Sequence, residues 1–365
     1  MDKMVIASDS FKGTLSSLDI CNLYKDNVKD VSLRCLPIAD GGEGSLDAIS
    51  HAVEGKFIEC EVKNLYFNNI TTHFYIDKYN KAYIEAASCV GLSLAHKDND
   101  PGKVTTYGLG EQISKAIELG IKNIYIFLGG SASNDGGVGL AAALGVKFHN
   151  KNNESFIPTG LTLIDISRID NSIALKKLEG INLIVLSDVS SPFYGPEGAA
   201  YKFAPQKGAS NDEVRLLDEG LRYLDTFINV NNVKGAGAAG GLGGGLVGLL
   251  GASIKSGINT LLELMHFDEV IKDADYVISG EGKLDKQTLD GKVIDGVAKY
   301  CNKNNKKLIL VVGISEISLE EVKKIYPCVI SLYETNEKHL PFEEIRRDAK
   351  SDYIKVINKL ISTKE

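Results

Sequence analysis

Residues 4–13 read MVIASDSFKG, a short apolar run that ends in small residues, an acid and a glycine. Five later runs have a similar form: VSLRCLPIA (31–39), NIYIFLGG (123–130), DYVISG (275–280), LILVVG (308–313) and CVISLY (328–333). Strands that are apolar throughout are typical of a parallel sheet whose two faces are both covered. The six runs therefore predict a buried, mostly parallel sheet.

Helical patterns lie between several of these strands. Ser16 with Asp19, and Ser318 with Glu321, have the spacing of a capping box at the start of a helix. Pro341 precedes a long amphipathic stripe and predicts the first turn of a last helix. Alternating strands and helices predict a doubly wound, Rossmann-like α/β domain.

Two stretches depart from this alternation. Residues 56–90 carry strands separated by polar turns, which predicts antiparallel hairpins. Residues 146–269 hold one more strand, proline-containing loops, a long helix and a glycine-rich run. Because 365 residues exceed what one hydrophobic core usually serves, we expect two domains. The predicted division gives 1–55, 97–145 and 270–365 to the Rossmann-like domain, and 56–96 and 146–269 to a second α/β domain inserted into it.

The composition narrows the class of protein. A net charge of −7 without any basic block argues against nucleic acid as a partner. Six scattered cysteines without a C-x-x-C pair are typical of free thiols in a reducing compartment. The first apolar run is too short for a signal peptide, and the longest apolar stretch is too short to span a membrane. We expect a cytoplasmic protein without a membrane partner, and a homo-oligomer is left open.

Acidic, glycine-containing loops follow four of the predicted strands: SDSFKG (8–13), ADGGEG (39–44), GGSASNDGG (129–137) and SGEGKLD (279–285). Ligands of doubly wound sheets bind beyond the carboxyl ends of the strands. Any one such loop could be a plain polar turn, but four at one sheet edge favour a ligand site. Glycine-rich turns bring backbone N–H groups to phosphate oxygens, and carboxylates suit Mg²⁺. This combination is the one that phosphoryl transfer from ATP requires.

Candidate site residues come from these loops and from the second domain. The candidates for substrate or phosphate binding are Ser8, Asp9, Ser10, Gly41, Gly42, Ser131, Asn134, Lys207, Gly240, Gly241, Gly280, Gly282 and Lys283. The candidates for metal binding are Asp40, Glu43, Asp135, Glu281 and Asp285. Asp188, which ends a strand beside a proline-stiffened loop, is the candidate base or hydroxyl-orienting group. Lys12 is the candidate cation for the transferred phosphoryl group.

The run KGAGAAGGLGGGLVGLLG (234–251) contains the spacing G-x-G-x-x-G at Gly235, Gly237 and Gly240. This spacing raises the alternative of an NAD-dependent hydroxy-acid dehydrogenase. A dinucleotide fingerprint requires a strand before it and an acid about 20 residues after it. The residues before the run, INVNNV (228–233), make a poor strand, and position 260 is Thr with Glu263 the nearest downstream acid, so the fingerprint fails on context. The run instead predicts a turn and the start of a packed helix.

The chain resembles the type I glycerate kinases. Seven segments carry the resemblance, in the family's order: DSFKGTLSS (9–17), PIADGGEG (37–44), LGGSASNDGG (128–137), DVSSPFYGPEGA (188–199), FAPQKGA (203–209), GAAGGLGGG (237–245) and SGEGKLDKQTLDGK (279–292). The resemblance implies phosphorylation of D-glycerate by ATP with Mg²⁺, usually giving 2-phosphoglycerate. It also implies two α/β domains with the active site in the cleft between them, and it favours a glycine run (234–251) whose turn faces a ligand over glycines that serve packing alone. Ser133 and Ser191 stand where the family tends to have Thr and Asn.

Two points remain open at this stage. A non-catalytic protein that closes two lobes on a sugar acid is a second alternative, although such proteins are usually exported and no signal segment is present. The residues alone also leave open whether the 2- or the 3-hydroxyl is phosphorylated and which domain holds ATP.

Overall fold

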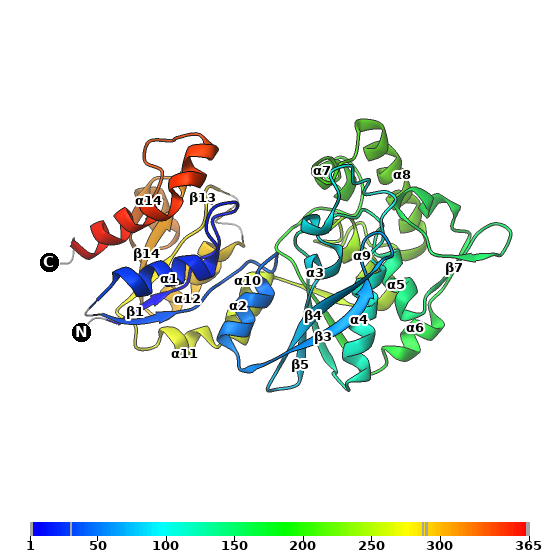
Figure 1. Cartoon of the computed structure of the whole chain (residues 1–365), viewed down its shortest axis with the longest axis horizontal. Helices are drawn as coiled ribbons and strands as arrows, with labels where there is room; N and C mark the ends of the chain where they lie inside the picture. Colours follow the sequence, from blue (N-terminus) through cyan, green and yellow to red (C-terminus); the bar gives the residue numbers. More distant parts are fainter. Residues whose placement is uncertain (1–2, 30, 287, 289–290, 363–365) are drawn as a thin grey trace. The chain divides into compact units, whose positions relative to one another are not determined.

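The run at residues 4–8 supplies β1 (Lys3–Ile6) of a five-stranded parallel sheet in the computed structural model, which describes residues 3–29, 31–286, 288 and 291–362. The neighbours of β1 are β2 (Ser32–Cys35) and β12 (Tyr276–Ser279), followed outward by β14 (Lys307–Val312) and β16 (Val329–Glu334). The sheet order is β16-β14-β12-β1-β2 (Figure 1). The predicted doubly wound, mostly parallel sheet is confirmed.

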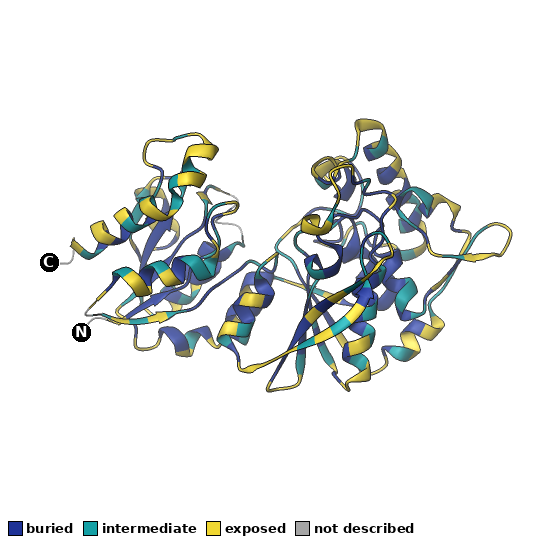
Figure 2. Cartoon of the chain, viewed as in Figure 1, coloured by how far each residue is buried: buried dark blue, intermediate teal, exposed yellow. Residues whose placement is uncertain are grey.

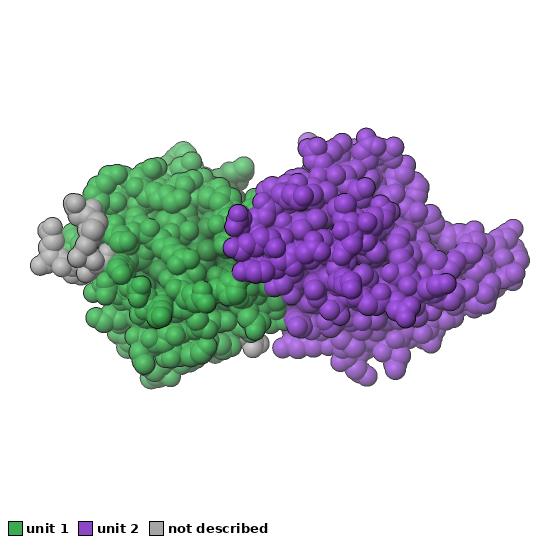
Figure 3. Space-filling model, turned by 90° about the horizontal axis from the view of Figure 1, so that it is seen from below, with its two compact units in different colours: residues 1–40, 47–53, 256–365 green, residues 41–46, 54–255 purple. Residues whose placement is uncertain are grey.

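The chain is divided into two compact units (Figure 3). Unit 1 consists of Met1–Asp40, Asp47–Val53 and Ser256–Glu365, and it contains the five-stranded sheet. Unit 2 consists of Gly41–Leu46 and Glu54–Lys255.

Helices cover both faces of the sheet in unit 1. α1 (Ser17–Asn27) and α14 (Phe342–Ser362) share one buried core with alternate residues of β1, β12 and β14. α12 (Val293–Lys303) contacts β12 and β14, and it contributes nothing to that core, so it covers the opposite face. The other elements of unit 1 are α10 (Gly257–Leu264), α11 (Phe267–Ile271), α13 (Leu319–Ile325), and the short paired strands β13 (Lys283–Leu284) and β15 (Ile314–Ser315). α2 (Ser45–Ala52) runs from residues of unit 2 into unit 1.

Both capping boxes exist as the sequence predicts. The Ser16 hydroxyl accepts from the N–H of Asp19, and the carboxylate of Asp19 accepts from the N–H of Ser16 at the start of α1. Ser318 and Glu321 do the same at the start of α13. These bonds satisfy N–H groups that the first helical turn leaves without partners.

Unit 2 is built on a six-stranded mixed sheet of order β11-β10-β6-β5-β4-β3. β3 (Gly55–Lys63), β4 (Asn69–Asp77) and β5 (Lys81–Glu85) form the antiparallel hairpins that the sequence predicts. β6 (Asn123–Phe127), β10 (Asn182–Leu186) and β11 (Ser253–Lys255) continue from β5 in parallel. The inner strands of both sheets are largely buried, whereas edge strands such as β2 and β3 and the outer helix faces are more exposed (Figure 2).

The remaining elements of unit 2 surround one buried core. They are α3 (Ala87–Val90), α4 (Tyr107–Glu118), α5 (Val138–Leu144), α6 (Ser172–Lys177), α7 (Ala199–Phe203), α8 (Asn211–Ile228), α9 (Leu242–Leu250), the 3₁₀ turns η1 (Leu92–Leu94), η2 (Gly160–Asp165) and η3 (Pro205–Lys207), and a small sheet of β7 (Lys147–His149), β8 (Ser155–Phe156) and β9 (Arg168–Asp170).

The units differ from the predicted domains in four segments, and two of these, 41–46 and 54–55, were expected in the Rossmann-like domain but lie in unit 2. Residues 97–145 were expected in the Rossmann-like domain but lie in unit 2, because β6 pairs with β5 and β10 and α4 packs on α5. Residues 256–269 were expected in the inserted domain but lie in unit 1, because α10 packs on α12. Within the described ranges, none of the helices is both long and apolar enough to cross a membrane.

Candidate active site

Three acidic residues lie at the carboxyl ends of β1, β2 and β12. We refer to Asp9, Asp40 and Glu281 as the carboxylate cluster. The N–H of Asp9 donates to the carbonyl of Gly280 over 2.9 Å, and the hydroxyl of Ser8 donates to the same carbonyl over 3.1 Å. The strand order reverses between β1 and β12, and this switch point is where open α/β sheets bind ligands.

The electrostatics of the carboxylate cluster are typical of a functional site. Burial, together with the charge of Asp40, raises the pKa of Asp9 to about 7. Burial raises the pKa of Glu281 to about 8, and the charges of Asp9 and Asp40 add to this effect. Lys292 opposes the shift only in part, with its Nζ 3.9 Å from Oε2 of Glu281. Such clustered shifts mark sites where a ligand or ion completes the charge balance.

Glu281 also has an unsatisfied atom. Its Oε1 is buried and has no hydrogen-bond partner among the described residues. A buried carboxylate oxygen without a partner carries a large desolvation cost, which a bound cation removes. No group of three acidic, His or Cys side chains in the described part of the chain could hold a metal ion by itself. The cluster therefore fits Mg²⁺ that takes only one or two protein carboxylates and completes its shell with phosphate oxygens and water.

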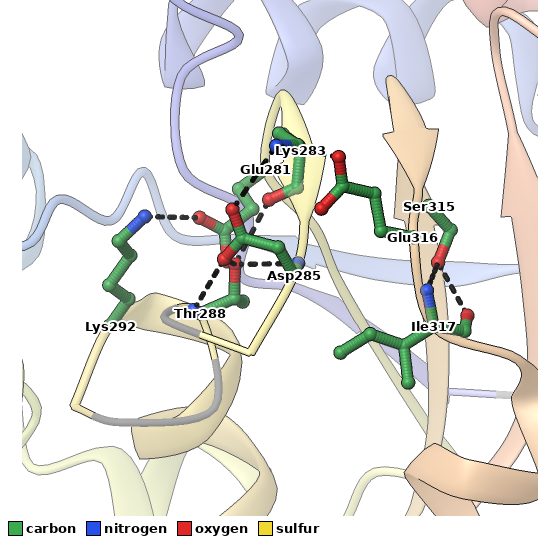
Figure 4. A network of polar contacts seen from close by, with 8 residues as sticks. All are labelled: Glu281, Lys283, Asp285, Thr288, Lys292, Ser315, Glu316 and Ile317. Carbon is green, nitrogen blue, oxygen red and sulfur yellow. Dashed lines mark hydrogen bonds and ion pairs between the residues drawn. The ribbon is translucent and has the colours of Figure 1, made fainter.

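Polar contacts hold the loop after Glu281, both within the loop and to Glu316 after β15 (Figure 4). Lys283 lies 2.9 Å from Oε1 of Glu316 and 3.5 Å from Oδ2 of Asp285. Oδ1 of Asp285 accepts from the N–H of Thr288 over 3.0 Å. Lys283 and Asp285, predicted to bind phosphate and metal, thus have partners that shape this loop.

The other candidates of unit 1 flank the cluster. The N–H of Ser10 donates to Oδ1 of Asp9 over 2.6 Å. Lys12 is exposed, and its charge partly offsets the effect of burial on the pKa of Asp9. A Cβ on Gly280 would lie 1.7 Å from the carbonyl oxygen of Val311, so this position needs glycine to let β12 and β14 approach. Gly282 follows the cluster in the loop to β13.

In unit 2 the predicted binding residues surround a buried lysine. Lys207, at the end of η3, is only 4% exposed. Its Nζ donates to the carbonyl of Ser133 over 2.7 Å and contacts the hydroxyl of Ser131 at 3.1 Å. Burial lowers the pKa of Lys207 to about 7, although the charge of Asp135 opposes the shift. We refer to Ser131, Ser133, Asn134 and Lys207 as the lysine cluster.

The lysine cluster contains several buried polar atoms without hydrogen-bond partners among the described residues. They are both amide atoms of Asn134 and the hydroxyl of Ser133. The hydroxyl of Ser191, in the loop after β10, is a further one. Buried polar atoms of this kind are rare unless a ligand or water meets them. A cation with amide and hydroxyl donors beside it is suited to a small hydroxylated anion.

Asp135, a predicted metal ligand, has other partners. Its carboxylate accepts from the N–H and hydroxyl of Thr106 at 2.9 and 2.8 Å, and from the N–H groups of Gly137 and Gly139 at 3.1 and 3.3 Å. These bonds tie the start of α4 to the start of α5. Glu43, also predicted for metal, lies in the 41–46 segment, where a Cβ on Gly130 would be 3.2 Å from its Oε2. Of the five predicted metal ligands, Asp40 and Glu281 are the two that come together.

The glycine run is a turn followed by α9. Residues 231–241 form turns after α8, and no strand precedes them, so the dinucleotide fingerprint lacks its structural context. Gly240 has φ +71°, and a Cβ there would lie 2.2 Å from the carbonyl of Ser133 and 3.0 Å from Nζ of Lys207. Gly241 packs against Phe193. Close packing thus accounts for both glycines, and a ligand contact at either one stays a prediction.

The predicted base and two candidate glycines lie in unit 2 loops. Asp188 is half-buried at the carboxyl end of β10. Gly41 and Gly42 belong to the 41–46 segment, and Gly42 packs on Gly129, where a Cβ would approach its Cα to 2.4 Å.

Sequence reasoning missed two residues that act on these clusters. Lys292 pairs with Glu281, and both lie in the segment 279–292 that the sequence analysis singled out. A lysine so near in sequence to a predicted metal ligand is a signal that could have indicated this pair. Asn99 donates to the carbonyl of Lys207 over 2.7 Å and holds the backbone of that residue in place. Asn99 is far from Lys207 in sequence, and its segment carries no motif that could have indicated this contact.

Comparisons with known proteins point in one direction. The model of the glycerate kinase family matches residues 4–364. The chain is 34% identical to a glycerate kinase of Halalkalibacterium halodurans over 358 residues, which cover 93% of this chain and 94% of the relative. It is 37% identical to the glycerate 2-kinase of Escherichia coli K12 over 323 residues, 85% of either chain. A crystal structure from Salmonella typhimurium LT2, described as glycerate kinase 2, superposes with a TM-score of 0.80 at 33% identity and covers 99% of this chain and 98% of its own.

Proposed function

Because the chain belongs to the glycerate kinase family, we propose that it transfers the γ-phosphoryl group of ATP to D-glycerate. The acceptor is the 2-hydroxyl, so the products are 2-phospho-D-glycerate and ADP. The name of the Escherichia coli relative, glycerate 2-kinase, supports this position. The structural observation that carries the proposal is Oε1 of Glu281, which is buried beside Asp9 and Asp40 at a switch point and has no partner among the residues that the structure describes.

Mg²⁺ binds at the carboxylate cluster in this proposal. One or two of the carboxylates of Asp9, Asp40 and Glu281 would hold it, with the phosphates of ATP as further ligands. When bound there, Mg²⁺ would neutralise charge on the β- and γ-phosphates. Lys12, in the same loop as Asp9, would contact the transferred phosphoryl group.

D-glycerate binds at the lysine cluster. Its carboxylate would pair with the protonated form of Lys207, and its hydroxyls would meet the amide of Asn134 and the hydroxyl of Ser133. This assignment is supported by the unsatisfied atoms of Asn134 and Ser133, because a carboxylate and two hydroxyls supply both donors and acceptors.

Asp188 is the proposed base or hydroxyl-orienting group, since it ends β10 in the unit that carries the lysine cluster. A positioned base contributes about 10²–10⁴-fold to a rate. We therefore expect Asp188→Asn to lower kcat by roughly that factor while circular dichroism stays native. Asp165→Asn, an exposed carboxyl in η2, is the matched control and should keep full turnover. Unchanged kcat in Asp188→Asn would remove Asp188 from this role.

The activity itself is tested by ADP release from ATP and D-glycerate, with and without Mg²⁺. Metal-dependent ADP formation is the expected result, and phosphorus NMR of the product should show a phosphate on the 2-hydroxyl. Reduction of NAD by glycerate would support a dehydrogenase instead. Binding of glycerate without any turnover would support a non-catalytic sugar-acid binding protein.

The cytoplasm is the proposed location. Supply of ATP is compatible with it, and so are the six free cysteines, which are typical of a reducing compartment.

A further inference from the structure

Unit 1 contains a cavity of about 210 Å³ beside the carboxylate cluster. It lies at the carboxyl ends of β1, β12, β14 and β16, and the first turns of α14 form one wall. Gly282 in its lining follows Glu281 directly, and Phe11 is two residues after Asp9. The cavity and the cluster therefore share two strand-end loops.

The walls of the cavity are mostly apolar. Phe11, Leu15 and Ile314 come from the sheet side, and Phe342 and Ile345 come from α14. The amide of Asn336 bonds to both the N–H and the carbonyl of Leu340, and so fixes the loop that leads into α14. The helix wall is thus held in place by the chain itself, as expected of a preformed ligand pocket.

Phe342 is the most unusual residue of this wall. Its side chain is 51% exposed, although it lines a cavity. A Cβ on Gly13 would come within 2.8 Å of its Cζ, so the tip of the ring lies against Gly13. A large exposed ring beside a cavity offers a flat face on which a planar ligand can stack.

The apolar walls suit some parts of ATP and glycerate better than others. Glycerate is a three-carbon anion with a polar group on each carbon, and an apolar cavity would strip its water without replacement. The base of ATP is its flat, uncharged part. Pockets that enclose a whole ligand measure roughly 300–1,000 Å³, so about 210 Å³ suits one ring system.

We propose that the adenine ring of ATP binds in this cavity against Phe342, with the phosphates directed to the carboxylate cluster. Unit 1 is then the nucleotide-binding unit. Lys12 lines the same cavity three residues after Asp9, so its ammonium group borders both the ring site and the cluster. The assignment rests on the proposed kinase function, and it adds which unit holds ATP and which residues contact the base.

The test measures nucleotide binding apart from turnover. Isothermal calorimetry with Mg·ADP is run on the full chain, on Phe342→Ala and on Ala349→Trp, which places a large side chain in the α14 wall. Stacking of a base on an aromatic ring is worth about 1–3 kcal/mol, so Phe342→Ala should weaken ADP binding on the order of tenfold. The KM for D-glycerate should stay unchanged in both variants. Phe227→Ala, an exposed phenylalanine of α8 in unit 2, is the matched control and should bind ADP normally.

The outcomes separate this inference from the proposed function. If Phe342→Ala and Ala349→Trp bind ADP as tightly as the original chain, the cavity does not hold adenine, whatever the enzyme phosphorylates. If both variants lose ADP affinity, the cavity assignment stands, even where D-glycerate gives no ADP release and the kinase proposal fails. A native melting profile of Phe342→Ala, whose ring is about half exposed, shows that the affinity was not lost through unfolding.

Discussion

Lys207 is the residue whose titration should be visible in the kinetics. Burial lowers its pKa to about 7, and the bound carboxylate of D-glycerate needs its protonated form. Below pH 7 the lysine of the free protein is charged, so the KM for D-glycerate should not depend on pH. Above pH 7 the charged fraction falls, and this KM should increase up to about tenfold per pH unit. Steady-state kinetics between pH 6 and pH 9 measure the effect.

Two variants of Lys207 separate its charge from its packing. Lys207→Arg keeps a positive charge across this range, so the rise in KM above pH 7 should disappear. Lys207→Met removes the charge and should give a high KM at every pH. A KM of the original chain that stays flat from pH 6 to pH 9 would contradict the assignment of glycerate to the lysine cluster.

At the scale of elements, the turn before α9 allows packing and ligand contact to be told apart. Gly240 and Gly251 both have φ +71°, but a Cβ on Gly251 would meet no atom within 4 Å. Gly251→Ala should therefore cost only the left-handed backbone penalty, about 1–2 kcal/mol of unfolding free energy. Gly240→Ala should cost about 1–3 kcal/mol more, because its Cβ lies 2.2 Å from the carbonyl of Ser133. Urea unfolding of both variants measures the difference.

The same pair decides the role of the glycine run. Equal losses of stability, together with a raised KM for D-glycerate in Gly240→Ala alone, would favour a turn that contacts the ligand over one that only packs.

Local patterns predicted elements well because their causes are local. The capping boxes at Ser16 and Ser318 and the hairpins of 56–90 depend on neighbours within a few residues. The meeting of Asp9, Asp40 and Glu281 followed from one topological rule about strand ends. The bonds of Asp135 to Thr106 and the pairing of Lys283 with Glu316 join distant segments, and no local pattern encodes them.

At the scale of the whole molecule, the sequence did not predict which strands belong to which sheet. The segment 97–145 has the same strand and helix rhythm as unit 1, and rhythm does not reveal that β6 pairs with β5 and β10. The cavity beside α14 was also unpredictable, because its walls come from both ends of the described chain, from Phe11 to Asp352. The proposal that unit 1 holds ATP depends on those walls.

The two units have separate hydrophobic cores, and each substrate is assigned to one of them. We therefore expect calorimetry to resolve two unfolding transitions, one raised by Mg·ADP and the other by D-glycerate. A ligand at 100 times its Kd stabilises the state that binds it by about 2.7 kcal/mol. For units of this size each kcal/mol raises Tm by about 2–4 °C, so each shift should be roughly 5–10 °C. Phe342→Ala should abolish only the shift with Mg·ADP, and Lys207→Met only the shift with D-glycerate. If both ligands raise the same transition, the division of ATP and glycerate between the units is wrong.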